Sequence, residues 1–318
     1  PNDFNSSISF DSRMYKEDIE GSIAHATMLG RCGIIKEEEA DDIVKGLKGI
    51  LADIENGTLH IDMEAEDIHT FIEGELTKRI GDNGKRLHTS RSRNDQVAVD
   101  IKLYLKKEVV NVKNLVVGLI KVIADKAEKY SETVMPGYTH LQRAQPITFG
   151  HHLLAYGEML LRDVSRLEDC LKRMDEMPLG SCALAGTTYP IDRTITAELL
   201  GFDRITNNSL DGVSDRDYCI EFASVLSIIM VHLSRFSEEI IMWCSWEFKF
   251  IEQTLSKLSG EKVIITFVPH LLPVNRGILA TVYADIKDGV TFEQIRKAYE
   301  DFYKDEFFVR LLDDGKCA

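Results

Sequence analysis

Residues 95–130 have the sequence DQVAVDIKLYLKKEVVNVKNLVVGLIKVIADKAEKY. Apolar residues recur along this stretch in steps of four and three, at Val97, Ile101, Leu105, Val109, Val112, Val116, Leu119 and Ile123. This spacing places them on one face of a single long α-helix. No proline occurs between Pro1 and Pro136 to interrupt it.

Other segments predict further helices. Residues 147–174 form a second long helical segment, bounded by Pro146 and Pro178, and residues 37–56 form a shorter, acidic one. A third long stripe consists of Tyr218, Phe222, Val225, Ile229, Leu233, Phe236, Ile240 and Trp243. Helices of this length need partners along their whole length, so the sequence predicts a bundle.

The pattern changes after Glu252. Residues 262–268 and 277–284 are rich in β-branched and aromatic residues and predict two strands, the first ending at Pro269. Residues 292–305 predict an amphipathic helix, and residues 307–312 a third strand.

We therefore predict a mainly α fold, a bundle of long helices with a short α/β segment at the C-terminal end. Its expected parts are residues 1–94, residues 95–252 and residues 253–318. The segments that join the long helices are rich in glycine, serine and threonine. Such loops lie at the ends of a bundle and are suited to carry function.

Composition excludes several classes of function. The net charge of −14 argues against a nucleic-acid partner, which requires a basic surface. No uninterrupted run of 18 apolar residues predicts a membrane span, and the first residues do not resemble a signal peptide. The six cysteines have no CxxC spacing, which is typical of reduced thiols in a cytosolic protein. No glycine-rich phosphate loop is present.

Arg91, Arg93 and Asn94 directly precede the long helix that begins near Asp95. Two guanidinium groups, an amide and a helix N-terminus together form a good receptor for carboxylates. An exposed polar cap, with Asp95 as the capping acid, explains the same pattern equally well.

The stretch from Pro136 to Pro146 predicts a loop between two long helices, with Thr139 beside His140. The imidazole can transfer a proton near neutral pH, and the hydroxyl can donate a hydrogen bond to an acid. For a lone histidine, a hydrogen bond to a loop carbonyl is the more common role.

Two groups of residues suggest metal ligands only superficially. Glu64, Glu66, Asp67 and His69 match no ligand spacing, and a solvated helix start is the better interpretation. The neighbours His151 and His152 project about 100° apart on a helix, so they do not share an ion.

Taken together, these segments resemble the argininosuccinate lyase family of the fumarase/aspartase superfamily. The resemblance covers most of residues 4–252 and is carried by Phe4–Ile8, His88–Val97, Met135–Pro146, Pro178–Gly186, Asn208–Asp211 and Asp215–Asp217. It implies a helical, cytoplasmic homotetramer that acts in arginine biosynthesis without a metal or organic cofactor. It also implies reversible elimination of argininosuccinate to fumarate and arginine, in active sites built from three subunits.

The resemblance assigns roles residue by residue. His140 is the expected catalytic histidine, and Thr139 beside it is expected to contact the substrate in the reaction. The expected substrate-binding residues are Ser7, Asp11, Arg93 and Asn94. Small molecules, namely argininosuccinate, fumarate and arginine, are the implied partners.

The chain departs from the family in one segment. The family carries a Gly-Ser-Ser-x-Met-Pro-x-Lys-x-Asn-Pro loop, in which the serine acts as the base and the lysine stabilises the carbanion. That loop is absent after Glu252, and neither Ser256 nor Ser259 has the surrounding pattern. The sequence therefore predicts no measurable release of fumarate, and a catalytically inactive helical scaffold is the alternative function.

The C-terminal part resembles another family. The stretches Ile251–Gly260 and Phe267–Leu279 are similar to the C-terminal region of N-acetyl-gamma-glutamyl-phosphate reductase. The cofactor-binding domain and nucleophilic cysteine segment of that enzyme have no counterpart in the sequence. We therefore expect a join between two sequences of arginine biosynthesis near residues 251–253.

Overall fold

The computed structural model describes residues 6–245 and, beyond them, residues 248, 256, 260, 262, 266–270, 279–283 and 289–304. The chain divides into two compact units, Pro1–Leu233 and Ser234–Ala318, which are described separately. The division falls inside a helix, and the three-part organisation expected from the sequence stays a prediction.

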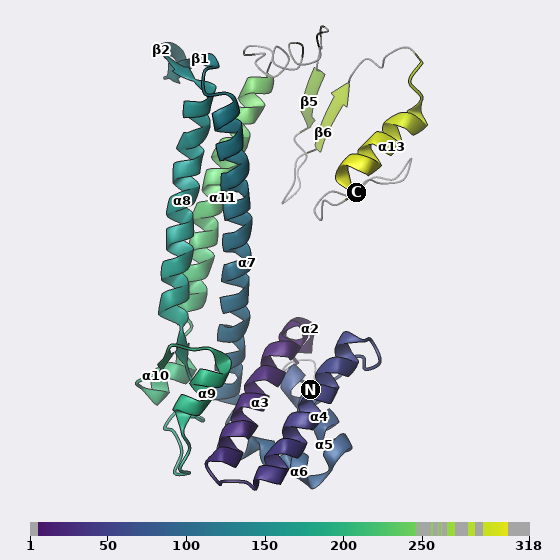
Figure 1. Cartoon of the computed structure of the whole chain (residues 1–318), viewed down its shortest axis with the longest axis vertical. Coiled ribbons are helices and arrows are strands. Elements are labelled where there is room, and N and C mark those ends of the chain that lie inside the picture. Colours follow the sequence, from purple (N-terminus) through teal and green to yellow (C-terminus); the bar gives the residue numbers. More distant parts are fainter. Residues whose placement is uncertain are drawn as a thin grey trace. The chain divides into compact units, whose positions relative to one another are not determined.

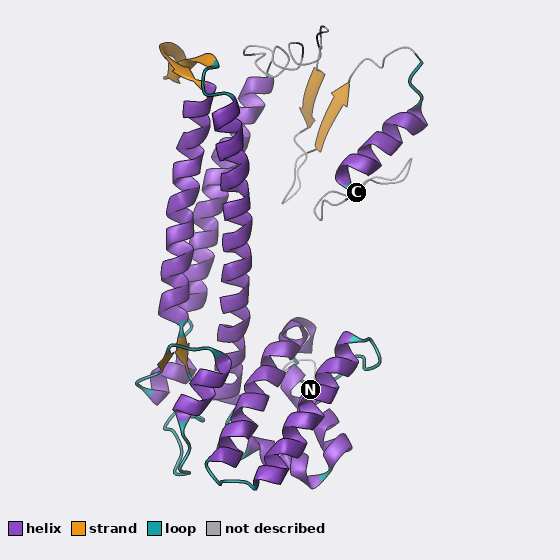
Figure 2. Cartoon of the chain, viewed as in Figure 1, coloured by secondary structure: helices purple, strands orange, loops and turns teal. Residues whose placement is uncertain are grey.

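Helices make up most of the described chain, and strands are limited to short pairs (Figure 2). The fold is therefore mainly α, as the sequence predicts. The N-terminal part of the first unit contains α2 (Ile8–Asp11), η1 (Ser12–Met14), α3 (Tyr15–Arg31), α4 (Glu37–Glu55), α5 (Ile68–Ile80), α6 (Asp82–Lys85) and η2 (Arg86–His88).

These N-terminal helices enclose an apolar core of their own. The completely buried side chains come from α3, α4 and α5 at helical spacing: Ile19, Leu29, Ile43, Leu47, Ile50, Ile68, Ile72 and Leu76. Burial of large aliphatic side chains stabilises such a core by roughly 1.5–3 kcal/mol for each side chain.

Three long helices, α7 (Arg93–Lys129), α8 (Phe149–Met174) and α11 (Asp217–Cys244), form the predicted bundle (Figure 1). Tyr218, Phe222, Val225 and Ile229 of the predicted α11 stripe are buried. In α7 the buried positions include Val109, Val116 and Ile123, one every seven residues. α7 and α11 therefore pack through parts of the stripes that the sequence predicts, although Ile240 of the α11 stripe is exposed.

Two polar contacts join α11 to α8. His232 binds the buried carboxylate of Asp163 on α8, with 2.6 Å between Nδ1 and Oδ2. The Arg173 guanidinium of α8 donates from Nε to Glu221 of α11 at 2.9 Å. Polar partners of this kind set the rotation of a helix that apolar packing alone leaves free.

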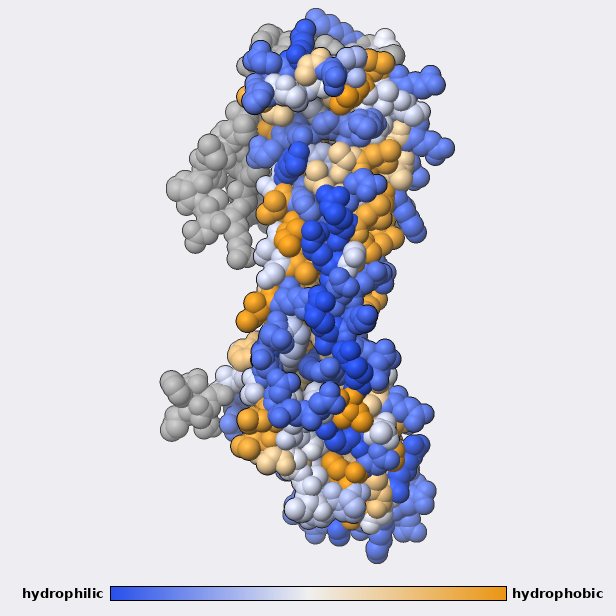
Figure 3. Space-filling model, turned by 90° about the vertical axis from the view of Figure 1, so that its left-hand side faces the viewer, coloured by the Kyte–Doolittle hydropathy of each residue, from blue (hydrophilic) through white to orange (hydrophobic). Residues whose placement is uncertain are grey.

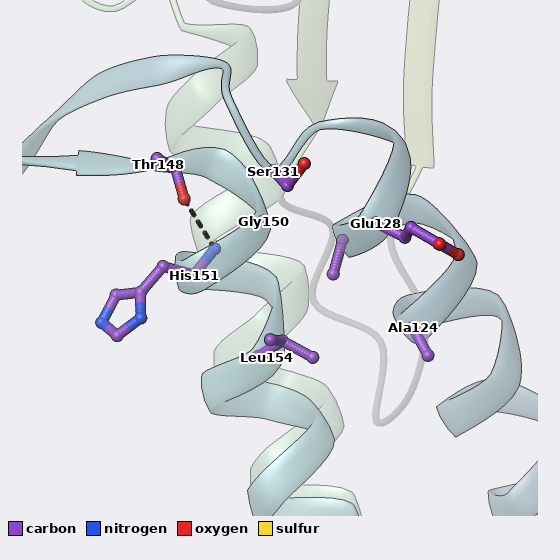
Figure 4. A pocket seen from close by; sticks show the side chains of 8 residues that line it. Ala124, Glu128, Ser131, Thr148, Gly150, His151 and Leu154 are labelled. Atoms are coloured by element: carbon purple, nitrogen blue, oxygen red, sulfur yellow. Dashed lines mark hydrogen bonds between the residues drawn. The ribbon is translucent and has the colours of Figure 1, made fainter.

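The end of α7 and the start of α8 approach closely at Gly150 (Figure 4). Thr148 caps α8 by accepting a hydrogen bond from the backbone N–H of His151 at 3.1 Å. The imidazole of His151 points away from the pocket that Leu154 and Ser131 help to line (Figure 4).

We expect Gly150→Ala to lower the free energy of unfolding by about 1–3 kcal/mol. A Cβ at this position would lie 2.4 Å from the Ala127 carbonyl oxygen and 3.0 Å from Cα of Ser131, so backbone must move. The matched control is Gly118→Ala on α7, where a Cβ meets nothing within 4 Å. The control should gain up to about 1 kcal/mol, because alanine restricts the unfolded chain. Urea titration measures the free energy of unfolding of both variants, which should decrease for Gly150→Ala and increase for Gly118→Ala.

The stretch from Pro136 to Pro146 was predicted to be a loop, and this is wrong in detail. It is a β-hairpin of β1 (Val134–Thr139) and β2 (Gln142–Thr148), paired antiparallel from Thr139 and Gln142 outward. The alternating residues of this hairpin are too polar to stand out as strands in the sequence.

Shorter elements lie at the opposite end of the bundle. They are β3 (Glu176–Met177), α9 (Arg193–Leu200), β4 (Arg204–Ile205) and α10 (Ser209–Ser214), with β3 and β4 paired in parallel. The Arg193 guanidinium ties them together by donating to the backbone oxygens of Leu179, Met177 and Thr206.

Apolar side chains are exposed along the long helices, in patches between hydrophilic ones (Figure 3). The most exposed include Leu115 and Val122 on α7, Leu161 on α8, and Ile220, Met230 and Val231 on α11.

Within the described residues, α11 is also long and apolar enough to cross a membrane by length and composition. The prediction of no span rested on uninterrupted apolar runs. Core helices of soluble proteins pass the same test, so this match is weak evidence.

The second unit contains β5 (Thr266–His270), β6 (Leu279–Tyr283) and α13 (Phe292–Tyr303). β5 pairs antiparallel with β6, from Thr266 opposite Tyr283 to His270 opposite Leu279. The strands and the helix confirm the predicted elements, although β5 runs through Pro269. The third predicted strand, residues 307–312, lies outside the described residues.

Candidate active site

The start of α7 is fixed by a reciprocal cap. Ser92 accepts from the backbone N–H of Asn94 at 3.3 Å, and Asp95 accepts from the backbone N–H of Ser92 at 3.0 Å. Asp95 therefore takes part in the cap, as predicted, although Ser92 is the N-cap residue and the Asp95 side chain is buried rather than exposed. The cap is compatible with ligand binding, since Arg93 and Asn94 project from this same first turn.

Arg93 lies among acceptors from two helices. Its Nη1 donates to Oε1 of Gln96 at 2.7 Å and to Oε1 of Glu73 at 3.3 Å, and its Nη2 donates to Oγ1 of Thr70 at 3.3 Å. Nε lies 3.5 Å from a carboxylate oxygen of Asp67. The Arg93 side chain is 32% exposed, so its guanidinium remains accessible to a ligand.

Arg91 has a different environment. Its side chain is only 1% exposed, and it donates to Oγ of Ser22 at 2.9 Å and to Oε1 of Glu73 at 3.3 Å. The expectation that both arginines receive one carboxylate is therefore wrong. A buried guanidinium needs internal acceptors, and Arg91 finds them in the N-terminal helices.

Burial opposes ionisation of Glu73, but His88, Arg91 and Arg93 together hold the pKa of its carboxyl below its usual range. The two arginines thus share one internal anion. A carboxylate ligand at Arg93 competes with that anion for the same guanidinium.

Ser7 and Asp11 lie beside the same segment of chain. Oγ of Ser7 donates to Oδ2 of Asp11 at 2.5 Å, and Oδ1 of Asp11 accepts from the backbone N–H of Ile68 at 3.1 Å. The backbone N–H of Ser7 donates to the Glu66 carbonyl at 2.8 Å. Ser7 and Asp11 thus contact one part of residues 66–70, and Arg93 contacts another part of the same segment.

Asn94 faces the loop of residues 178–188. Its Nδ2 donates to the Ala183 carbonyl at 2.9 Å. The buried carboxylate of Asp95 accepts from the backbone N–H groups of Gly180 at 3.0 Å and Cys182 at 2.8 Å. One acid thus anchors both the helix start and the loop that faces Asn94.

Thr139 and His140 lie at the exposed tip of the β1–β2 hairpin. His140 and Leu141 have φ values of 52° and 58°. Positive φ at both central residues of a two-residue hairpin is the geometry of a type I′ turn, which favours asparagine and glycine. Two side chains held in this unfavourable conformation mark a segment with a functional constraint.

A single chain does not bring all six predicted residues together. Arg93 begins α7 and the hairpin follows its end, and α7 has 37 residues. At roughly 1.5 Å per residue this separates Arg93 from His140 by about 55 Å (Figure 1). Thr139 and His140 can therefore meet Ser7, Asp11, Arg93 and Asn94 only across different copies of the chain.

The sequence did not reveal a buried cluster of Asp18, His69 and Asp100. Nδ1 of His69 lies 2.8 Å from Oδ1 of Asp18 and 3.2 Å from Oδ2 of Asp100. Burial and the charge of Asp18 raise the pKa of the Asp100 carboxyl. Burial opposes ionisation of His69, but Asp18 and Asp100 raise its pKa above the usual range. His69 therefore belongs to the protein interior, and only Asp67, the N-cap of α5, matches the predicted helix start.

The sequence model of a family described as lyase matches residues 2–260. The chain belongs to this lyase family. The match includes every predicted site residue, from Ser7 to His140.

Curated relatives of this chain include argininosuccinate lyases. Those of Desulforamulus reducens and Clostridium beijerinckii are 56% and 57% identical to it over 290 and 291 residues. Each alignment covers 91% of this chain and 63% of the relative. The chain therefore spans less than two thirds of the length of these relatives, and the similarity reaches beyond residue 252.

Solved structures show the same fold. EDDS lyase in complex with formate is 32% identical to this lyase, with a TM-score of 0.69 over 75% of this chain and 47% of that one. The 3-carboxy-cis,cis-muconate lactonizing enzyme of Pseudomonas putida is 18% identical, with a TM-score of 0.59 over 76% of this chain and 56% of that one. At 18% identity the likeness shows the fold alone.

The end of the chain matches a second family model, described as the semialdehyde dehydrogenase dimerisation domain, over residues 249–318. The two matches overlap at residues 249–260. The second match confirms the predicted likeness of the C-terminal part to a reductase. The overlap includes residues 251–253, where the join between two sequences stays a prediction.

Proposed function

We propose that this lyase carries the substrate-binding half of an argininosuccinate lyase site. In an assembly that supplies the missing serine segment, it catalyses reversible elimination of argininosuccinate to fumarate and arginine. The observation that carries the proposal is the grouping of Ser7, Asp11 and Arg93 around residues 66–70, with Asn94 beside it. The identity of 56% to an argininosuccinate lyase favours that substrate over other acids.

The chemistry fits this group of residues. Removal of a proton beside a carboxylate creates a carbanion with additional negative charge. Fixed donors directed at that charge lower the barrier, and Arg93 and Asn94 are such donors. His140 is suited to assist proton transfer or to bind a carboxylate when charged.

By itself, the chain is proposed to form a cytoplasmic homotetramer, and the serine segment then has to come from a mixed assembly with a relative that carries it. The separation of Arg93 from His140 supports the homotetramer, because one chain cannot form the whole site. The exposed apolar side chains of α7, α8 and α11 support it as well, since they provide surfaces for packing against other copies. Small acids and arginine are the proposed ligands, with no cofactor.

A catalytically inactive scaffold is the second candidate. The observation in its favour is the match of residues 249–318 to the dimerisation domain, in the place where the family carries its catalytic serine. Such a chain would bind the ligands and leave them unchanged.

Binding tests the proposal directly. We expect fumarate and argininosuccinate to bind saturably in isothermal titration calorimetry, and Arg93→Met to weaken both by about tenfold or more, because a charged hydrogen bond is lost. Lys113→Met on α7, a partly exposed cation that pairs with Glu168 far from Arg93, is the matched control and should bind as the unmodified chain does. Absence of saturable binding by the unmodified chain contradicts the proposal.

A further inference from the structure

Gln96 lies one turn beyond Arg93 on α7, and its side chain is almost completely buried. Its Oε1 accepts from Nη1 of Arg93 at 2.7 Å. Its Nε2 donates to Oδ1 of Asp18 at 2.5 Å. The amide therefore connects a partly exposed guanidinium to a carboxylate in the protein interior.

Only one orientation of the Gln96 amide satisfies both neighbours. A guanidinium can only donate, so the amide oxygen must face Arg93. An ionised carboxylate can only accept, so the amide nitrogen must face Asp18. Rotation of the amide by half a turn would place like partial charges together on both sides, so the bond to Arg93 is fixed in direction.

The carboxylate behind Gln96 is itself fixed. Asp18 on α3 binds His69 on α5, which also contacts Asp100 on α7. Each of these three side chains is at most 2% exposed. Three packed helices thus hold the acceptor of Gln96, and a shift of Asp18 would disturb the interior.

The other contacts of Arg93 are longer. Glu73 and Thr70 lie at 3.3 Å, and Asp67 at 3.5 Å. Without the Gln96 acceptor, the carboxylates of Asp67 and Glu73 are the strongest remaining attractions for the Arg93 guanidinium. A guanidinium paired with internal carboxylates has fewer donors available for a ligand.

We propose that Gln96 is a positioning residue, which accepts the shortest hydrogen bond of the Arg93 guanidinium, limits its pairing with Asp67 and Glu73 to longer contacts, and directs it toward a substrate carboxylate. The inference rests on the carboxylate-binding role of Arg93 under the proposed function. Gln96 acts through Arg93 and through the buried cluster of Asp18, His69 and Asp100 behind it.

A double-mutant cycle tests this inference. Gln96→Met keeps the length of the side chain and removes the amide group, so the hydrogen bonds to Arg93 and to Asp18 are both lost. Fumarate affinity is measured by calorimetry for Gln96→Met, Arg93→Met, the double variant and the unmodified chain. In the chain that keeps Arg93, we expect Gln96→Met to weaken fumarate binding about tenfold. In the Arg93→Met variant, the same substitution should weaken it by less than about twofold. Asn111→Leu, an exposed amide on α7, is the control.

A second measurement needs no substrate. Phenylglyoxal modifies accessible arginines, and mass spectrometry compares its rate at Arg93 with that at the exposed Arg143. Gln96→Met should change the Arg93 rate relative to Arg143 severalfold, whereas Asn111→Leu should not. If Gln96→Met does not fold, Gln96→Asn, whose shorter amide cannot reach both Arg93 and Asp18, should change the rate at Arg93 in the same way.

The positioning role of Gln96 would be overturned if Gln96→Met weakened fumarate binding equally with Arg93 present and with Arg93→Met. It would also be overturned if Gln96→Met left the rate of phenylglyoxal modification at Arg93 unchanged. If the unmodified chain binds no fumarate, the proposed function fails, and the reaction rate at Arg93 alone then decides the role of Gln96.

Discussion

Purified by itself, the chain should release no measurable fumarate from argininosuccinate. The sequence lacks the segment that in this family supplies the base and the lysine that stabilises the carbanion. A positioned base contributes roughly 10²–10⁴ to the rate. Loss of the lysine, which stabilises the charge of the carbanion, lowers the rate by a further factor of about 10²–10³. The ultraviolet absorbance of fumarate measures release. Turnover near that of the Clostridium beijerinckii relative would show that the serine segment is not needed.

A mixed assembly of this chain with an active relative tests whether His140 works when the serine segment is supplied. The chain is refolded together with the Clostridium beijerinckii relative, whose motif histidine is replaced by asparagine. Sites that combine His140 of this chain with the serine segment of the relative should then release fumarate. The matched control is His140→Asn in this chain, which should restore none. Mixed assemblies that form but stay inactive would contradict the role of His140.

Asp95→Ala should lower the free energy of unfolding by about 3–5 kcal/mol, the cost of leaving several buried donors without an acceptor. The carboxylate is completely buried and accepts from the backbone N–H groups of Ser92, Gly180 and Cys182. Cys182 has a φ of 51° and Gly180 a φ of 88°, so this loop depends on its anchor to keep an uncommon conformation.

The control for Asp95 is Asp192, which caps α9 from an exposed position by accepting from the backbone N–H of Thr194. Asp192→Ala should cost only about 1 kcal/mol, because water replaces the carboxylate. Urea titration measures both free energies. Asp95→Ala should also weaken fumarate binding in calorimetry, since Asn94 contacts the displaced loop at Ala183. Similar stability losses at both positions would contradict the anchoring role.

The long helices could be predicted because their determinants are local. The step of four and three residues in α7 and α11 and the capping sequence at Ser92 act within one or two turns. The hairpin at Thr139 could not be predicted in this way, since its strands are polar and its turn contains His140 and Leu141 in place of the usual asparagine and glycine.

Sequence motifs located the predicted site residues. They did not indicate that Thr139 and His140 lie at one end of α7 and the other predicted residues at the opposite end. Ser7, Asp11 and Arg93 share a neighbourhood because residues 66–70 contact both the α2 segment and the start of α7. Both arginines contact the N-terminal helices, but Arg91 is buried there and Arg93 is partly exposed, a difference that no local pattern encodes.

The sequence by itself determined the helical bundle, the lyase motifs and the change of pattern near residues 251–253. Helical periodicity and contiguous motifs depend on neighbours along the chain, so a linear sequence contains them. Only the tertiary structure decided which polar side chains become partners. Gln96 and Asp18 are 78 positions apart, and their hydrogen bond exists because α3 packs against α7 and excludes water from both. Burial then makes each such partner necessary, which is why Gln96, Asp95 and Arg91 gain their roles only in the folded chain.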